Sequence, residues 1–272
     1  MKIGLSGEMY PPKFSVEEAL RHAASCGADG YELTIPRTGP VSLEHPDGFE
    51  HIRQAAIESG MEIPSMVCPV HWEMPLTDPD PEHRAIGMAA LEQALEVGRR
   101  LGIGLLLLVP GVVTASVPYA DAYGRAQEAV RRLARRAEEL GMRIGIENVW
   151  NKFLLSPLEM VRFIDEIGSS AVGAYFDVGN IMAYGFPQHW IATLGSRILA
   201  VHVKDYRTDV AGYGGFVYLL QGSVPWQAVR TELEHIGYNG YITAELPPYR
   251  TFPEDAATDA VRTMRRIFAC ER

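Results

Sequence analysis

Residues 102–147 have the sequence GIGLLLLVPGVVTASVPYADAYGRAQEAVRRLARRAEELGMRIGIE. The stretch starts with an apolar β-type run at Ile103–Val109 and ends with a second one at Arg143–Glu147. Near-continuous apolar runs are typical of strands buried on both faces of a parallel sheet. Between the runs, apolar residues such as Ala129 and Leu133 recur at three- and four-residue spacing, with Arg and Glu at the other positions. The stretch therefore predicts two parallel strands joined by an amphipathic helix.

The same alternation recurs along the whole chain. Eight β-type runs are found at Lys2–Ser6, Gly30–Thr34, Glu62–Val67, Ile103–Val109, Arg143–Glu147, Gly173–Asp177, Ile198–Lys204 and Tyr241–Leu246. The helical patterns between and after them include Val16–Cys26, Glu82–Leu101, Ala120–Leu140, Leu158–Ile167, Trp226–Ile236 and Glu254–Phe268. Glycine follows most of these helices, as a left-handed cap requires, and Ser156 with Glu159 predicts a capping box. The length of 272 residues matches a (β/α)₈ barrel. We predict an α/β protein with one TIM-barrel domain spanning residues 1–272.

The composition favours a soluble globular protein and argues against several classes. Hydrophobic residues make up 47% of the chain and charged residues 22%, enough apolar material for a large core. With a net charge of −9 and no basic footprint for nucleic acid or anionic lipid, we expect neither a nucleic-acid nor a membrane partner. Three widely spaced cysteines without a C-x-x-C pattern favour the cytoplasm, and the first residues do not resemble a signal peptide. A homo-oligomer is possible, although no patch can be assigned to an interface.

Four potential metal ligands fall at the ends of strands five to eight. They are Glu147, Asp177, His202 and Glu245. The carboxyl ends of TIM-barrel strands surround the active site, and an unpaired charge at the rim of a buried sheet is costly. Any one of the four could instead be paired to an arginine or to the backbone. Together, three carboxylates and one imidazole predict a site for one divalent cation, Mn²⁺ foremost, with Mg²⁺ or Co²⁺ as alternatives.

The segments around these residues carry a family resemblance. They are IGIENVWNKFLLSPLE (144–159), YFDVGN (175–180), VHVKD (201–205), LLQGSVPW (219–226) and ITAEL (242–246). With them the chain resembles the xylose isomerase-like superfamily over essentially its whole length, and within it the ketose 3-epimerases. The order Glu, Asp, His, Glu on strands five to eight is the most specific feature, and it indicates the superfamily more firmly than a particular reaction.

The resemblance implies a metal-dependent sugar epimerase. It implies that Glu147, Asp177, His202 and Glu245 bind one divalent metal ion, and that Glu147 and Glu245 serve as acid and base at C3 of a ketose or ketose phosphate. Inversion of a carbon beside a ketone needs a base on one face, an enediolate, and an acid on the other face. The alternatives are a lyase or dehydratase acting on a 3-keto sugar or keto-inositol, an aldose–ketose isomerase, and a non-catalytic binding protein. An endonuclease would need more histidines and a basic groove.

Two positions depart from the D-tagatose 3-epimerase pattern and leave the substrate open. Asn180 stands three residues after the aspartate, where that family has a substrate-binding histidine. Thr208 stands six residues after the histidine, where the family has an arginine, and Arg207 lies beside it. Asn180 and Arg207 are therefore candidate substrate contacts, with a helix cap and a solvated surface arginine as the alternatives.

Two loops at the same end of the predicted barrel are long enough to act as lids. Cys68–Pro81 carries His71 and Trp72, and Asp205–Pro225 carries Phe216. We expect His71 and Trp72 to contact the substrate. Packing of the loop onto the barrel is the alternative for the tryptophan.

Three further charged residues are placed near the strand ends. Glu8 and Lys204 are candidate substrate contacts, and Lys204 could instead pair with Asp205. For Glu32, near the end of the second strand, we expect a buried hydrogen-bonding role. No nucleotide-binding loop of the P-loop type occurs, and the balance is slightly against a phosphate requirement.

Overall fold

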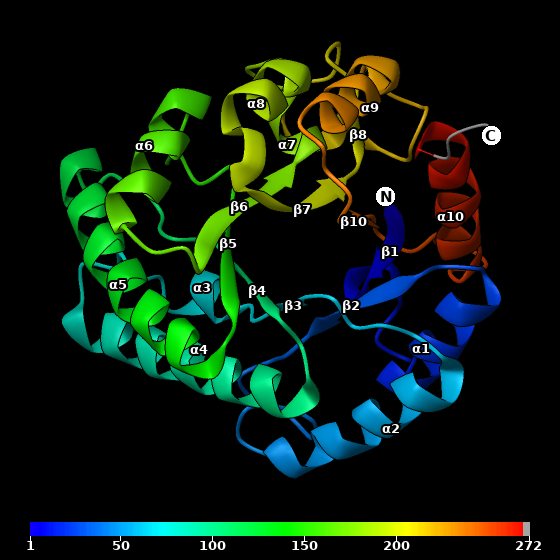
Figure 1. Ribbon diagram of the computed structural model, residues 1–272, viewed down its shortest axis with the longest axis horizontal. Coiled ribbons are helices and arrows are strands. Elements are labelled where there is room, and N and C mark those ends of the chain that lie inside the picture. Colours follow the sequence, from blue (N-terminus) through cyan, green and yellow to red (C-terminus); the bar gives the residue numbers. More distant parts are fainter. Residues whose placement is uncertain (269–272) are drawn as a thin grey trace. The chain divides into compact units, whose positions relative to one another are not determined.

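The computed structural model describes residues 1–268, and its eight parallel strands close into a barrel in the order β1-β10-β7-β6-β5-β4-β3-β2 (Figure 1). The strands are β1 (Lys2–Ser6), β2 (Gly30–Thr34), β3 (Met66–Val67), β4 (Leu105–Leu108), β5 (Arg143–Glu147), β6 (Val172–Asp177), β7 (Ile198–Val203) and β10 (Tyr241–Ala244). The predicted TIM-type barrel is confirmed.

The helices alternate with the strands. They are α1 (Val16–Ser25), α2 (Phe49–Ser59), α3 (Val70–Glu73), α4 (Pro81–Leu101), α5 (Tyr119–Leu140), α6 (Pro157–Ile167), α7 (Val178–Ile181), α8 (Pro187–Leu194), α9 (Trp226–His235) and α10 (Asp255–Phe268). All six helices with predicted bounds are present, each end within one residue of its prediction. None of the helices between residues 1 and 268 is long and apolar enough to cross a membrane.

Several predicted strands are too long. The third was expected at Glu62–Val67, but only Met66–Val67 is a strand, and Glu62 makes an isolated bridge to Gly30. Pro64 lies between these two pieces, and a proline cannot donate the backbone hydrogen bond that a central strand needs. The long loop after β7 also contains a short antiparallel pair, β8 (Asp205–Tyr206) with β9 (Phe216–Val217), which the sequence analysis did not predict.

Two compact units make up the chain. The first consists of Met1–Leu33, His51–Pro64 and the chain from Phe176 onward, and the second of Thr34–Glu50 and Ser65–Tyr175. Within the second unit, the long helices α4 and α5 lie side by side and pack on β4 and β5 (Figure 1). That the whole chain acts as one domain stays a prediction.

The helix ends are fixed largely by local sequence. Gly102, Gly141 and Gly168 follow α4, α5 and α6 in the left-handed conformation, as predicted. Ser156 caps α6 by accepting a bond from the amide of Glu159. The expected reciprocal half of the capping box is replaced by another bond, because the carboxylate of Glu159 accepts from the amide of Leu155 at 2.9 Å.

Candidate active site

Asp177 is held rigidly where β6 ends. It is fully buried, and its Oδ1 accepts a hydrogen bond of 2.6 Å from the amide of Asn180, which caps the short helix α7. Gly179 permits α7 to pack this closely, since a Cβ there would lie 2.7 Å from the carbonyl oxygen of Lys204. The remaining carboxylate oxygen of Asp177, Oδ2, lies 2.8 Å from the Lys204 ammonium.

His202, the penultimate residue of the first unit's β7, is oriented by a second carboxylate. Its Nε2 lies 2.9 Å from Oε1 of Glu32, and both side chains are buried. Its Nδ1 lies 3.6 Å from Oε1 of Glu245. A proton on Nε2, donated to Glu32, leaves the Nδ1 lone pair directed at Glu245, which is how metal-binding histidines are usually held. The predicted buried role of Glu32 is confirmed.

Lys204 places a positive charge among these carboxylates. Its ammonium group contacts both Asp177 and Glu245, and it lies 5.5 Å from the centre of the Phe216 ring. Burial raises the pKa of Asp177, and the charge of Lys204 opposes that shift. The sequence suggested Asp205 as a possible ion-pair partner of Lys204. The ion pairs that Lys204 forms in the structure are instead with Asp177 and Glu245.

Glu245 and Glu8 are less buried than Asp177 and His202. Glu245 directly follows β10, and its amide donates to the carbonyl of Val203 at 3.2 Å. Glu8 lies in a 3₁₀ turn after β1 and is exposed as a residue. Desolvation of its carboxyl group raises the pKa of Glu8, and the negative charge of Glu245 raises it further. The role of Glu8 as a substrate contact stays a prediction.

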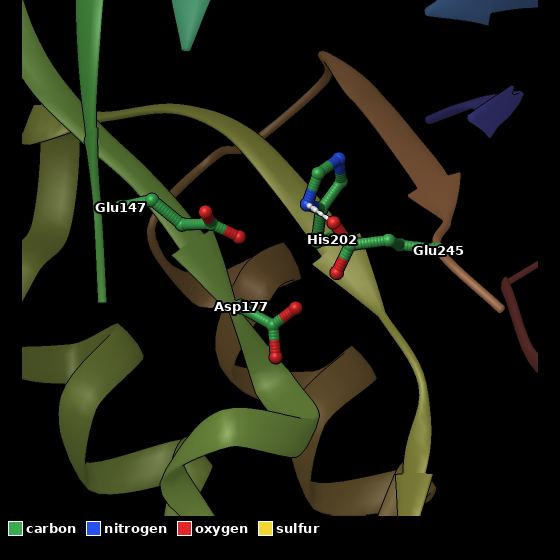
Figure 2. Close-up of side chains that lie close together, drawn as sticks. All are labelled: Glu147, Asp177, His202 and Glu245. Carbon is green, nitrogen blue, oxygen red and sulfur yellow. Dashed lines mark ion pairs between the residues drawn. The ribbon is translucent and has the colours of Figure 1, made fainter. Parts of the chain in front are cut away.

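Figure 2 shows the four predicted ligands together. Glu147, Asp177, His202 and Glu245 each offer one ligand atom, and these four atoms lie within 4.8 Å of one another. Three carboxylate oxygens and one imidazole nitrogen are a hard donor set that suits a divalent cation such as Mn²⁺ or Mg²⁺. The oriented His202 adds to this fit, so the residues present are suited to the metal that the sequence predicts.

The other predicted substrate contacts occupy different environments. Asn180 is buried in α7, beside Asp177, although Asp177 and not Asn180 caps that helix. Arg207 is exposed and pairs with Asp209 at 2.6 Å. Their roles as substrate contacts stay predictions.

In the second unit, the two candidates from the first long loop are neighbours in α3. His71 is buried, whereas Trp72 is 50% exposed, and their rings meet edge to face with centres 5.6 Å apart. Substrate contact by either residue stays a prediction.

Asp205, which was not among the functional residues expected from the sequence, organises the second long loop. The buried carboxylate of Asp205 accepts bonds from the amides of Leu220 and Val224 and from the indole N–H of Trp226, at 3.0 to 3.1 Å. Gly222 packs directly against this carboxylate, leaving no room for a Cβ. An aspartate directly after a strand, followed by a glycine in the same loop, was the available signal.

The comparisons with known proteins agree with this fold. A family model described as xylose isomerase-like TIM barrel matches residues 20–267. The chain belongs to this family. Two curated relatives are a provisionally named L-ribulose-5-phosphate 3-epimerase of Haemophilus influenzae and an L-ribulose-5-phosphate 3-epimerase of Shigella flexneri. They are 26% and 24% identical to this xylose isomerase-like chain, each over 90% of its length and over 88% and 86% of their own.

Solved structures share the fold of this xylose isomerase-like barrel. A D-tagatose 3-epimerase-like protein superposes with a TM-score of 0.84 at 19% identity, covering 98% of this chain and 97% of the other. A D-psicose 3-epimerase crystallised in the presence of D-fructose gives a TM-score of 0.81 at 19% identity, over 99% and 100% of the two chains.

Proposed function

We propose that this chain is a divalent-metal-dependent sugar epimerase that inverts C3 of a ketose or ketose phosphate. The observation that carries the proposal is the convergence of Glu147, Asp177, His202 and Glu245, because it supplies a metal site in which two of the ligands are glutamates. The names of the two curated relatives support the same reaction. A metal ion held by these four residues would polarise the ketone and stabilise the negative charge that develops on the substrate.

The two glutamates have the roles that inversion demands. One carboxylate removes the proton at C3 and produces an enediolate, and a second group returns a proton to the opposite face. We assign these roles to Glu147 and Glu245, since a single carboxylate cannot reach both faces of one carbon. His202 is kept in one orientation by Glu32 at 2.9 Å and does not exchange the proton itself in this scheme.

Residues around the cluster are assigned to the substrate. Lys204 and Glu8 interact electrostatically with Glu245, which supports our assignment of both residues as contacts to sugar oxygens. We retain Asn180, Arg207, His71 and Trp72 as further substrate contacts, as inferred from the sequence. The partner is a small sugar, and a homo-oligomer and a cytoplasmic location stay predictions.

Proton exchange in D₂O tests the reaction directly. The Mn²⁺-loaded protein is incubated with free and 5-phosphorylated ketoses, including L-ribulose 5-phosphate, and deuterium is located by NMR and mass spectrometry. We expect label at C3 together with the C3 epimer, with the preferred sugar showing whether phosphate is required. Label at C1 or C2 would identify an isomerase, and loss of water or an aglycone from a 3-keto sugar would identify a lyase.

Single glutamate variants test the roles of the two proton-transfer groups. Glu147→Gln and Glu245→Gln should each abolish epimer formation, because each removes one of the two proton-transfer groups. If one variant still exchanges the C3 proton without inversion, that variant has kept the base and lost the acid, which assigns the two roles. Full epimerisation by both variants, or by metal-free protein, would refute the proposal.

A further inference from the structure

A surface pocket in the second unit carries an unusual concentration of arginines. The pocket has a volume of about 330 Å³ and lies between α4 and α5. Its lining includes four arginines and one acidic residue: Arg84, Arg125, Arg132, Arg135 and Glu128. The chain as a whole carries a net charge of −9, so this pocket contrasts with the remainder of the sequence.

Two of these arginines are fixed beside each other by the backbone. Nη1 of Arg84 donates to the carbonyl oxygen of Asp78 at 2.7 Å, and Nη1 of Arg125 donates to the same oxygen at 3.3 Å. The two nitrogens therefore lie within about 6 Å of each other. Both arginines are half-buried and donate a second bond from Nη1 to a neighbouring carbonyl, of Pro79 and Thr77 respectively. Within residues 1–268, both guanidinium groups form hydrogen bonds through Nη1 alone, which leaves Nε and Nη2 without a protein acceptor there.

The charges in the lining are only partly compensated. Arg132 is neutralised by Glu92 through bonds of 2.7 and 3.0 Å. Within residues 1–268, Arg84, Arg125 and Arg135 form no ion pair with a carboxylate. When the pairing of Arg132 with Glu92 and the negative charge of Glu128 are both taken into account, the four arginines leave the lining with two excess positive charges. Like charges held this close repel each other, and an anion between them removes that repulsion.

We propose that this pocket binds a phosphate-bearing anion, distinct from any sugar at the carboxylate and histidine cluster. A phosphomonoester has close to two negative charges at neutral pH and offers three acceptor oxygens, which matches the excess charge of the lining and the free guanidinium donors. The volume lies at the lower end for small-molecule sites, which leaves room for a small organic group on the phosphate. The bound anion also stabilises the segment around Asp78, because the same two arginines hold its carbonyl.

Calorimetric titration of the full chain tests the site. The probes are inorganic phosphate and glycerol 2-phosphate, with chloride at the same ionic strength as the background. We expect one saturable site in the wild type, weakened about tenfold or more in Arg84→Gln and Arg125→Gln through loss of a charged hydrogen-bond donor. Tighter binding of glycerol 2-phosphate would show that the ligand is a phosphorylated metabolite, and tighter binding of inorganic phosphate that it is the free ion.

Two further variants separate binding from folding. Arg135 lines the pocket but makes no hydrogen bond within residues 1–268, so Arg135→Gln should weaken phosphate binding and leave the unfolding temperature unchanged. Arg131, on the same helix, donates to the backbone carbonyl of Glu166 at 2.8 Å and lies outside the pocket, so Arg131→Gln should bind phosphate like the wild type. The absence of saturable binding in the wild type, or wild-type binding in all three pocket variants, would overturn the proposal.

Discussion

Replacement of Lys204 by methionine should tighten metal binding, the opposite of what loss of a metal ligand would do. The ammonium group contacts Asp177 and Glu245, two of the four candidate ligands, and its side chain is only 13% exposed. A divalent ion that takes those carboxylates must displace the ammonium. A hydrogen bond to a charged group contributes about 1.5–3 kcal/mol, so removal of the competitor should strengthen metal binding about tenfold to a hundredfold.

The same change should weaken the metal-free protein. Without the ammonium, the carboxylates repel each other with less compensation, and the free energy of unfolding should fall by about 1–3 kcal/mol. Binding is measured by titrating chelator-treated protein with MnCl₂ in a calorimeter, and folding by circular dichroism. Lys2→Met is the matched control, because Lys2 forms an exposed ion pair with Glu62.

Each outcome of this titration has a distinct meaning. Equal or weaker Mn²⁺ affinity in Lys204→Met, with the fold intact, would refute competition between the lysine and the metal. A wild-type protein that binds no divalent metal would instead refute the proposed function, whatever the variant does.

Three other changes test the reasoning about positioning, pH and packing. Glu32→Gln should weaken Mn²⁺ binding about tenfold, because His202 loses the charged acceptor that orients it, and unchanged affinity by calorimetry would contradict this. Burial alone would raise the pKa of Asp29, but hydrogen bonds from Arg265 and from the backbone amide of Ile3 outweigh this effect and lower the pKa. The ionised carboxylate therefore stabilises the folded protein at pH values above the ordinary pKa of an aspartate. That stabilisation is lost as the pH falls through the pKa of Asp29 in the folded state. Asp29→Asn should therefore cost about 1 kcal/mol at pH 7 in urea unfolding and progressively less below about pH 4, and a pH-independent cost would count against the ionic contribution. Gly87→Ala should destabilise the protein by about 1–3 kcal/mol, because the added Cβ would collide with a backbone carbonyl. Gly124 lies on a helix with open space around it, so Gly124→Ala should stabilise the protein by about 0.5–1 kcal/mol. Similar melting temperatures for the two variants would contradict this difference in packing.

The helices and strands follow largely from local signals in the sequence. Apolar spacing fixed the six predicted helices to within one residue, and left-handed glycines ended several of them as expected. Local sequence patterns predicted the structure less well where hydrogen bonds between segments distant in sequence determine the strand boundaries. The third strand shrank to Met66–Val67, and the hairpin of β8 and β9 depends on the buried Asp205, whose partners lie 15 to 21 residues further along the chain.

The sequence by itself determined the barrel and the four candidate ligands, because strand periodicity and strand ends can be recognised locally and parallel strands bring their carboxyl ends to one side. Only the tertiary structure decided which group each of these charged side chains contacts. Glu32 and His202 are 170 residues apart in sequence yet 2.9 Å apart in space. Lys204 faces Asp177 and Glu245 and not its neighbour, and Arg84 and Arg125 share one carbonyl oxygen. The physical reason is that periodicity specifies which face a side chain occupies, whereas the partner of a charge depends on how segments distant in sequence pack together.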